Sequence, residues 1–366
     1  MTIAPYIHVR RMRNPTGVGQ HIIHMVEALA TAKGVQVNVL APRGDLEQGK
    51  RLPAPLGHVP ATPLPLPRKW LEMSWWGLNF PKVDRWCHDA DWVYCPAEAY
   101  VATKQVPLAV TVHDVHAFEP DLPWSNTPAH QQFCKRWRRL FGPIQRRAKL
   151  ILAVSQFTKS RLVELLHFDS ARIEVIGNGV EQAYFDPPAD IEVPREPYIY
   201  VIGGVTRRKG DQYLIELARR LKVVRPDMKI LVSGAGENES ERRADETGNI
   251  HRLGYMPVER QVAMLAGSRM SVFLSRYEGF GIPALEAMAA GTPVIVSHFA
   301  ALPEVVGEAG CVVDPTQTEQ VIETVLKLDQ DQAMREKMIA RGRARAAEFT
   351  WSKCAQRLID ALIAHR

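Results

Sequence analysis

The chain has 366 residues, of which 46% are apolar and 23% are charged, as is typical of a soluble globular protein. This length exceeds one ordinary core and fits two α/β domains. The longest apolar runs have the length of strands, which argues against a transmembrane helix. Residues 1–13 lack the apolar centre of a signal peptide. The five cysteines are odd in number and without metal-ligand spacing, so we expect reduced thiols in a cytoplasmic protein.

The net charge of +6 is unevenly distributed along the sequence. Residues 1–187 carry 22 Lys and Arg against 16 Asp and Glu, whereas the remaining residues carry 24 of each kind. A basic first half suits an anionic surface or an anionic acceptor. A solvated face without any partner explains the excess equally well.

The first half alternates segments with strand and helix patterns. We expect strands over residues 6–9, 35–40, 92–95, 108–112, 150–154 and 173–176, and an irregular Pro-rich segment over 42–67. Gly17 and Gly19 open a segment whose apolar residues recur at helical spacing. A Gly-rich turn there could receive a phosphate or a sugar, although two glycines can also form a simple tight turn.

Two segments of the first half are rich in basic residues. Between residues 68 and 86, four tryptophans and a phenylalanine lie among lysines and arginines. This pattern fits a membrane interface, but we favour a helix that packs on a sheet by its Trp face. Residues 135–139 and 146–147 add basic side chains on a predicted helix, for which contact with anionic lipid or a solvated face are both open.

His113 directly follows the predicted strand 108–112. In open α/β sheets, ligands bind at the carboxyl ends of strands. An imidazole there could act in acid–base chemistry or donate to an oxyanion. A purely structural histidine is an equally good interpretation of this position alone.

The strand–helix pattern restarts after a polar segment, residues 182–197, that contains four prolines. Strands are predicted over 198–202, 229–232, 250–253, 270–274 and 294–296, and helices over 211–224, 258–266, 318–328, 332–348 and 352–364. This alternation of strands and helices predicts two doubly wound domains. We place the first at 1–187 and the second at 188–350.

The segment 275–297 reads S-R-Y-E-G-F-G-I-P-A-L-E-A-M-A-A-G-T-P-V-I-V-S. It predicts a glycine turn that opens a helix, and such a helix start can bind an anion. Glu278 and Glu286 flank the turn and suit hydroxyl groups rather than phosphate. Arg208 and Lys209, which follow another strand, could neutralise a diphosphate, although adjacent basic residues often lie in a solvated loop. A ligand with hydroxyls at both ends and phosphates in the middle fits this set.

These motifs resemble the retaining glycosyltransferases of family 4, most strongly over residues 198–315. The segment 275–297 is similar to the two-glutamate motif of that family, and I-G-G-V-T-R-R-K-G is similar to its diphosphate loop. The stretches A-L-P-E-V-V-G, V-H-D-V, A-V-S-Q-F-T-K and I-G-N-G-V add weaker similarity, with Gly177 where the family usually has proline.

The resemblance implies a GT-B fold, in which two Rossmann-like domains face each other across a cleft. The acceptor-binding domain would be 1–187 with a crossover helix over 351–366, and the nucleotide-sugar domain would be 188–350. Glu278 would bind the donor sugar, Glu286 the ribose, and Arg208 and Lys209 the diphosphate. His113 would lie near the anomeric carbon and the acceptor. The complete implied donor-binding set is Gly17, Gly19, Gly204, Arg208, Lys209, Glu278, Gly279, Phe280, Gly281, Ile282 and Glu286, with His113, Glu278, Arg208 and Lys209 as catalytic residues.

The resemblance further implies a metal-independent, retaining hexosyltransferase without a cofactor other than its nucleotide sugar. The motif sequences are similar to those of mannosyltransferases of surface-polysaccharide pathways. GDP-mannose is therefore the expected donor, and a glycan or a lipid-linked molecule is the expected acceptor. We expect no nucleic acid partner. Peripheral contact with an anionic cytoplasmic membrane face stays open. A nucleotide-sugar epimerase of the same fold and a non-catalytic nucleotide-sugar binder are the alternatives.

Overall fold

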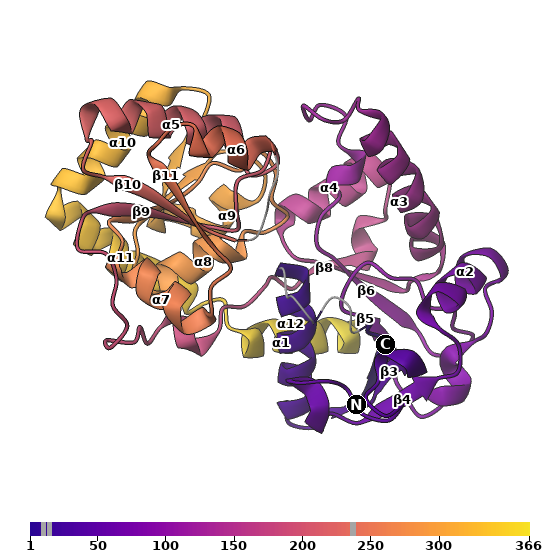
Figure 1. The fold of residues 1–366 in the computed structure, drawn as a ribbon. Coiled ribbons are helices and arrows are strands. Elements are labelled where there is room, and N and C mark those ends of the chain that lie inside the picture. Colours follow the sequence, from indigo (N-terminus) through magenta and orange to yellow (C-terminus); the bar gives the residue numbers. More distant parts are fainter. Residues whose placement is uncertain (9–11, 13–16, 235–238) are drawn as a thin grey trace. The chain divides into compact units, whose positions relative to one another are not determined.

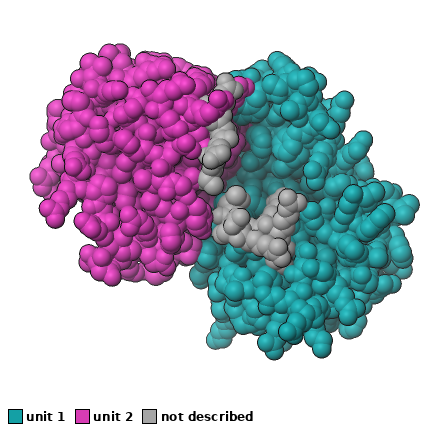
Figure 2. All heavy atoms as spheres, viewed as in Figure 1, with its two compact units in different colours: residues 1–179, 351–366 teal, residues 180–350 magenta. Residues whose placement is uncertain are grey.

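The computed structural model describes residues 1–8, 12, 17–234 and 239–366. The chain divides into two compact units, which Figure 2 distinguishes by colour. Unit 1 comprises residues 1–179 and 351–366, and unit 2 comprises residues 180–350. Each unit contains one six-stranded parallel sheet with helices on both faces, as the sequence predicts.

The sheet of unit 1 has the strand order β2-β1-β5-β6-β7-β8. A separate pair, β3 and β4, is joined to it by a bridge between Tyr6 and Leu40. The strands are β1 (Thr2–Pro5), β2 (Gln36–Val37), β3 (Val39–Pro42), β4 (Ala61–Leu64), β5 (Trp92–Cys95), β6 (Leu108–Val112), β7 (Leu150–Ala153) and β8 (Ile173–Val175). The helices are α1 (Gly17–Thr31), α2 (Arg68–Leu78), α3 (Pro128–Arg147), α4 (Gln156–Leu166) and α12 (Trp351–Ala364).

Both faces of this sheet are covered. Successive side chains of a strand point to opposite faces, and in β5 Trp92 and Tyr94 join one apolar cluster while Val93 and Cys95 join another. The first cluster is completed by α1 and α12, and the second by α2, α3 and α4. The last helix of the chain therefore returns to the core of unit 1, as the expected fold requires.

The sheet of unit 2 has the order β11-β10-β9-β12-β13-β14, the doubly wound arrangement of Rossmann-like domains. Figure 1 shows α5, α6 and α10 on one face and α7, α8 and α11 on the other. The strands are β9 (Tyr198–Ile202), β10 (Lys229–Ser233), β11 (Ile250–Gly254), β12 (Met270–Phe273), β13 (Val294–Ser297) and β14 (Cys311–Val313). The helices are α5 (Asp211–Val224), α6 (Glu239–Asp245), α7 (Val258–Gly267), α8 (Ile282–Ala289), α9 (Leu302–Val306), α10 (Thr318–Gln330) and α11 (Gln332–Ala346), of which the short α6 and α9 were not predicted.

The predicted first strand over 6–9 was wrong in position. The strand is β1 (Thr2–Pro5), and Tyr6 continues it only as an isolated bridge, while Val9 lies outside the described residues. Pro5 is tolerated at the end of β1 because the neighbouring strand β2 has already ended. Asn38 lies there, between β2 and β3. The side-chain amide of Asn38 donates to Thr62 Oγ1 at 2.9 Å. Thr62 belongs to β4, a strand within the segment 42–67 that was predicted to be irregular.

The predicted domain boundary after residue 187 was placed too late. Val180 already belongs to unit 2, where it forms a bridge with Thr350 and donates its backbone N–H to Phe349 O at 2.8 Å. The following 3-10 helix η7 (Gln182–Tyr184) contacts α7 and α8. The boundary was predicted from the prolines that follow Tyr184, but packing rather than composition determines where a unit ends.

The expected packing of a helix by its tryptophan face is confirmed only in part at α2. Trp75 is buried and packs edge-on against Tyr6 at 5.2 Å between ring centroids, and its indole N–H donates to Pro81 O. Trp70 and Phe80, in contrast, remain 62% and 60% exposed. Within the described ranges of the chain, no helix combines the length and the apolarity needed to cross a bilayer.

Candidate active site

The turn from β12 into α8 forms the centre of the candidate site in unit 2. Gly281 precedes α8 with a φ of +115°, and a Cβ on it would lie 2.6 Å from Leu302 Cδ2, so a larger residue would be strained and crowded. Pro283 lies in the first turn of α8, where its missing N–H has no helical partner to lose. Gly291, with a φ of +80°, follows the helix as a C-terminal glycine does. The predicted strand–turn–helix–strand order is thus present.

Glu278 lies at this turn and is held by two side chains. Arg208 Nη1 donates to Glu278 Oε2 at 2.7 Å, and Ser275 Oγ donates to Glu278 Oε1 at 3.0 Å. Burial alone would raise the pKa of Glu278, but the charges of Arg208 and Lys209 and these hydrogen bonds outweigh it and keep the pKa below its ordinary value. Glu278 is therefore a carboxylate at neutral pH.

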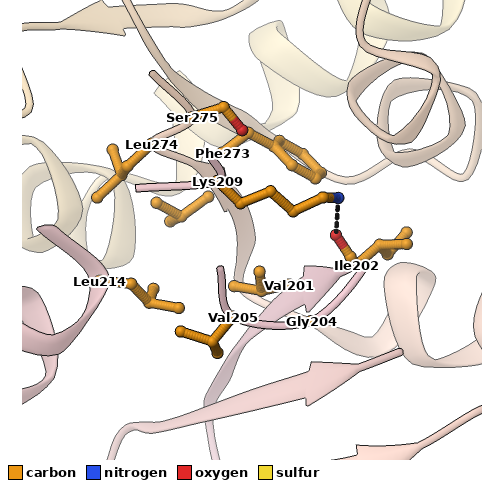
Figure 3. A pocket seen from close by; sticks show the side chains of 10 residues that line it. Val201, Ile202, Gly204, Val205, Lys209, Leu214, Phe273, Leu274 and Ser275 are labelled. Carbon is orange, nitrogen blue, oxygen red and sulfur yellow. Dashed lines mark hydrogen bonds between the residues drawn. The ribbon is translucent and has the colours of Figure 1, made fainter. Parts of the chain in front are cut away.

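Lys209 lies beside the glycines that follow β9. Its Nζ donates to Ile202 O at 3.2 Å, and a Cβ on Gly203 would lie only 2.1 Å from Nζ. Burial lowers the pKa of Lys209, and the field of Glu278 opposes that shift. Figure 3 shows the side chain along a small pocket that Gly204 and the ends of β9 and β12 line, with a volume of about 10 Å³, the size of one water.

Glu286 lies one turn into α8 and is almost fully buried, with 3% of its surface exposed. Its negative charge acts on the hydroxyls of Tyr184 and Tyr200, and the Tyr184 hydroxyl accepts a hydrogen bond from Gln261 Nε2 at 2.7 Å. Burial and Glu286 raise the pKa of Tyr184, so its hydroxyl stays protonated. The sequence analysis missed Tyr184, because it lies in a segment interpreted as a linker.

His113 directly follows β6, at the carboxyl end of the sheet of unit 1, as predicted. Its Nε2 lies 3.0 Å from Pro96 O, and a carbonyl can only accept, so Nε2 carries the proton. Its backbone N–H donates to Glu98 Oε1 at 2.6 Å. The ring of His21 lies edge-on at 4.6 Å between centroids. The histidine is thus fixed in orientation and tautomer.

His21 is a second buried histidine that the sequence analysis missed. Its Nδ1 lies 2.7 Å from Asn178 Oδ1 and its Nε2 lies 3.3 Å from the hydroxyl of Tyr94, which in turn contacts Thr111 Oγ1. Burial, and next the neighbouring His113, lower the pKa of His21 well below its usual value. His21 is therefore neutral in the folded protein.

The predicted site residues fall into two groups. Gly204, Arg208, Lys209, the turn 278–282 and Glu286 belong to unit 2, where Arg208 and Lys209 both act on Glu278. Gly17, Gly19 and His113 belong to unit 1. Gly17 is the first residue of α1 and Gly19 is buried, but residues 13–16, which directly precede Gly17, lie outside the described part. No three His, Cys, Asp or Glu side chains of the described residues cluster so as to hold a metal ion.

Comparison with known proteins covers both units. The family model "Glycosyltransferase Family 4" matches residues 15–184, and "Glycosyl transferases group 1" matches residues 185–345. The chain is 28% identical to the O-antigen chain mannosyltransferase B of Escherichia coli over 94% of this chain and 95% of that one. It is also 28% identical to a GDP-mannose-dependent monoacylated phosphatidylinositol monomannoside mannosyltransferase of Corynebacterium glutamicum, over 71% of each.

The fold also matches solved structures of this class. The sucrose-phosphate synthase of Thermosynechococcus elongatus superimposes with a TM-score of 0.77 at 20% identity, covering 100% of both chains. Two parallel-sheet units, a last helix that returns to unit 1, and family models over both units agree with one another. The chain belongs to the family 4 glycosyltransferases with the GT-B fold, and among them it is mannosyltransferase-like.

Proposed function

We propose that the protein transfers a hexose, with mannose the first candidate, from a nucleotide-diphosphate sugar to a glycan or a lipid-linked acceptor. The observation that carries the proposal is the grouping of Arg208 and Lys209 against an ionised Glu278 at the start of α8. The names of the two mannosyltransferase relatives support GDP-mannose as donor and a surface glycan or glycolipid as product.

Each side chain of this group suits one part of such a donor. The carboxylate of Glu278 would accept hydrogen bonds from hydroxyls of the sugar, and that of Glu286 would accept them from the ribose. The backbone of the turn into α8 and the cations Arg208 and Lys209 would hold the diphosphate between them. Arg208 Nη1 donates to Glu278 Oε2 and to Tyr277 O, and a guanidinium carries five N–H donors in a planar fork that matches phosphate oxygens.

The same cations would also serve the chemical step. The bond between the anomeric carbon and the diphosphate breaks, and negative charge grows on the leaving phosphate, which fixed cations stabilise. In the proposed retaining reaction the acceptor hydroxyl attacks from the face of departure and gives its proton to the leaving phosphate oxygen. Glu278 would act as a sugar binder rather than a nucleophile, since Arg208 and Ser275 already engage both its oxygens. His113, with its proton held on Nε2 by Pro96, would present Nδ1 as an acceptor toward another hydroxyl beside the anomeric carbon, since the attacking hydroxyl gives its own proton to the phosphate.

Radiolabelled nucleotide sugars provide the direct test. We expect GDP-mannose to yield GDP and labelled product when an extract of glycolipids and polysaccharide is supplied as acceptor. Release of a nucleoside diphosphate from another donor would identify a different donor sugar. Conversion of the donor sugar without acceptor would indicate an epimerase, and binding without turnover would indicate a non-catalytic binder. A folded sample that neither binds nor turns over any donor would refute the proposal.

The double variant Arg208→Ala with Lys209→Ala tests the diphosphate assignment separately. Two charge-assisted hydrogen bonds at about 1.5–3 kcal/mol each predict a loss of free nucleoside diphosphate affinity of roughly 100-fold or more. Affinity that stays unchanged in calorimetry would refute the assignment of these two residues.

We also propose that unit 1 contacts an anionic membrane surface. Helix α3 carries six Lys and Arg and no acidic residue, and these six are exposed. Helix α2, which contacts α3, exposes Trp70, Met73 and Leu78, with Phe80 just beyond its end. Basic side chains beside exposed aromatic ones suit anionic head groups and the interface below them.

Vesicle flotation tests this contact. The protein should float with vesicles that contain phosphatidylglycerol at low salt, and less so with pure phosphatidylcholine or at high salt. Trp70→Ser with Phe80→Ser should reduce flotation, while Val223→Ser, an equally exposed apolar position on α5, should not. No flotation with anionic vesicles would refute the contact.

A further inference from the structure

His21 is a buried titratable side chain to which the proposed mechanism gives no role. It lies on the buried side of α1, and none of its surface is exposed. Its ring meets the ring of His113 edge to face, at 4.6 Å between centroids and an interplanar angle of 88°. Trp351 of α12 is a further ring neighbour of His21, at 5.7 Å. The imidazole that would serve the transfer is thus in direct contact with a second imidazole.

Four side chains of unit 1 form a hydrogen-bonded relay through His21. His21 Nδ1 lies 2.7 Å from Asn178 Oδ1, an amide oxygen that can only accept, so Nδ1 carries the ring proton. Burial lowers the pKa of His21 well below its usual value, so the ring is neutral and its Nε2 is an acceptor. The Tyr94 hydroxyl, 3.3 Å from Nε2, therefore donates to it and accepts in turn from Thr111 Oγ1 at 2.9 Å. Every proton of the relay has an assigned direction, from Thr111 to Asn178.

The relay joins α1 to three separate parts of the unit 1 sheet. Tyr94 lies in β5, Thr111 lies in β6, and Asn178 follows β8 within the I-G-N-G-V stretch. No member of the relay exposes more than 2% of its surface, so a ring that turned away would leave buried polar groups without partners. An apolar side chain could fill the same space with no polar group to satisfy, so packing alone does not require a histidine. The relay instead holds His21 in one rotamer and one tautomer.

A fixed His21 limits the movement of the His113 ring. The bond from His113 Nε2 to Pro96 O, at 3.0 Å, holds that ring at one point and leaves it able to tilt. The perpendicular ring of His21 occupies the space into which it would tilt. His113 Nδ1 therefore keeps one direction.

We infer that His21 is a positioning residue of the transferase, which holds the imidazole of His113 in the orientation used for sugar transfer. The inference rests on the proposed function, because the orientation of His113 matters for transfer only if that reaction takes place. With none of its surface exposed, His21 acts through His113 rather than on a substrate.

Kinetics of sugar transfer by the full chain test this role. His21→Leu should lower kcat by about 10- to 100-fold, the loss that follows when reacting groups are misplaced. The KM for the donor and the calorimetric affinity for its free nucleoside diphosphate should stay unchanged. In a His113→Ala background the same substitution should cause no further loss of kcat, because the ring that it positions is absent.

Tyr94→Phe is a milder variant that tests the same relay if His21→Leu does not fold. It removes only the hydroxyl that donates to His21 Nε2, so we expect kcat to fall by about three- to tenfold, the worth of one hydrogen bond. Tyr100→Phe is the matched control. Tyr100 is also a buried tyrosine of unit 1, but its hydroxyl donates to Asn79 Oδ1 at 2.6 Å, and its loss should leave kcat unchanged. Thermal unfolding checks that each variant is folded at the assay temperature.

NMR of protein with ¹⁵N-labelled histidine observes the ring directly. The signals of His113, identified by their loss in His113→Ala, should show a single tautomer protonated on Nε2 in the wild type. In His21→Leu or Tyr94→Phe the same ring should show a mixture of tautomers, because it is free to turn.

The outcomes separate the inference from the proposed function. A wild type that transfers no sugar from any donor overturns the proposed function and the inference with it. Unchanged kcat in folded His21→Leu and Tyr94→Phe, or His113 signals identical to those of the wild type, overturn the inference alone. A parallel loss of nucleotide affinity, or a full further loss of kcat in the His113→Ala background, also overturns it, because a general folding defect acts in that way.

Discussion

Gly203→Ala should displace Lys209 from the donor site while leaving unit 2 folded. Gly203 follows β9 with a φ of +98°, and a Cβ on it would lie 2.1 Å from Lys209 Nζ and 3.1 Å from Lys209 Cε. These atoms are the far end of a flexible side chain, so the lysine moves rather than the backbone. Alanine at positive φ costs about 1–2 kcal/mol of stability, less than the total stability of a typical domain.

The displaced ammonium loses its place beside Ile202 O and its approach to a diphosphate. A hydrogen bond to a charged group contributes about 1.5–3 kcal/mol, so we expect roughly 10- to 100-fold weaker binding of GDP. Binding of guanosine, which has no phosphate, should stay unchanged. Isothermal titration calorimetry of both ligands, with thermal unfolding alongside, measures the two effects separately.

Two further variants make the reasoning refutable. Gly34→Ala introduces alanine at a φ of +77° in open space in unit 1, so it should cost similar stability but no GDP affinity. Lys209→Met should weaken GDP binding as Gly203→Ala does, and the two losses should not add when combined. Unchanged GDP affinity in Gly203→Ala, or fully additive losses, would show that Gly203 does not act through Lys209.

Three more predictions concern unit 1. His113→Ala should slow sugar transfer by about 100-fold, the loss typical of reacting groups that are no longer positioned correctly, with little change in donor affinity; equal losses in both would indicate a folding role. Because burial lowers the pKa of His21, the unfolded chain takes up its proton first as the pH falls. The free energy of unfolding should therefore drop below about pH 6.5 by up to about 1.4 kcal/mol per pH unit, until the folded-state pKa is reached. Denaturant titrations should show this slope reduced in His21→Gln, and an identical slope would contradict the prediction. Gly179→Ala places a Cβ 2.4 Å from the backbone N of Trp351, so overpacking should cost about 1–3 kcal/mol in thermal unfolding, and an unchanged melting temperature would show that this contact can relax.

Much of the fold could be predicted because its signals are local. Buried parallel strands such as β5 and β9 are short apolar runs on their own. Proline in the first turn of α8 and glycine after its last one mark that helix by backbone stereochemistry alone. The wrong positions, β1 and the boundary after residue 187, both involve prolines. The effect of a proline depends on which neighbour its missing N–H would face, and the sequence does not show that neighbour.

The sequence by itself predicts a ligand with hydroxyls at both ends and phosphates in the middle, because two carboxylates, a glycine turn and an Arg-Lys pair have chemical preferences that do not depend on the rest of the fold. Only the tertiary structure decided which groups hold these residues in place. Arg208 bonds Glu278 and Gln261 bonds Tyr184 because segments distant in sequence pack side by side. The same holds for His21, which reaches His113 from α1. Such contacts arise from packing, and no periodicity or spacing along a single chain encodes them locally.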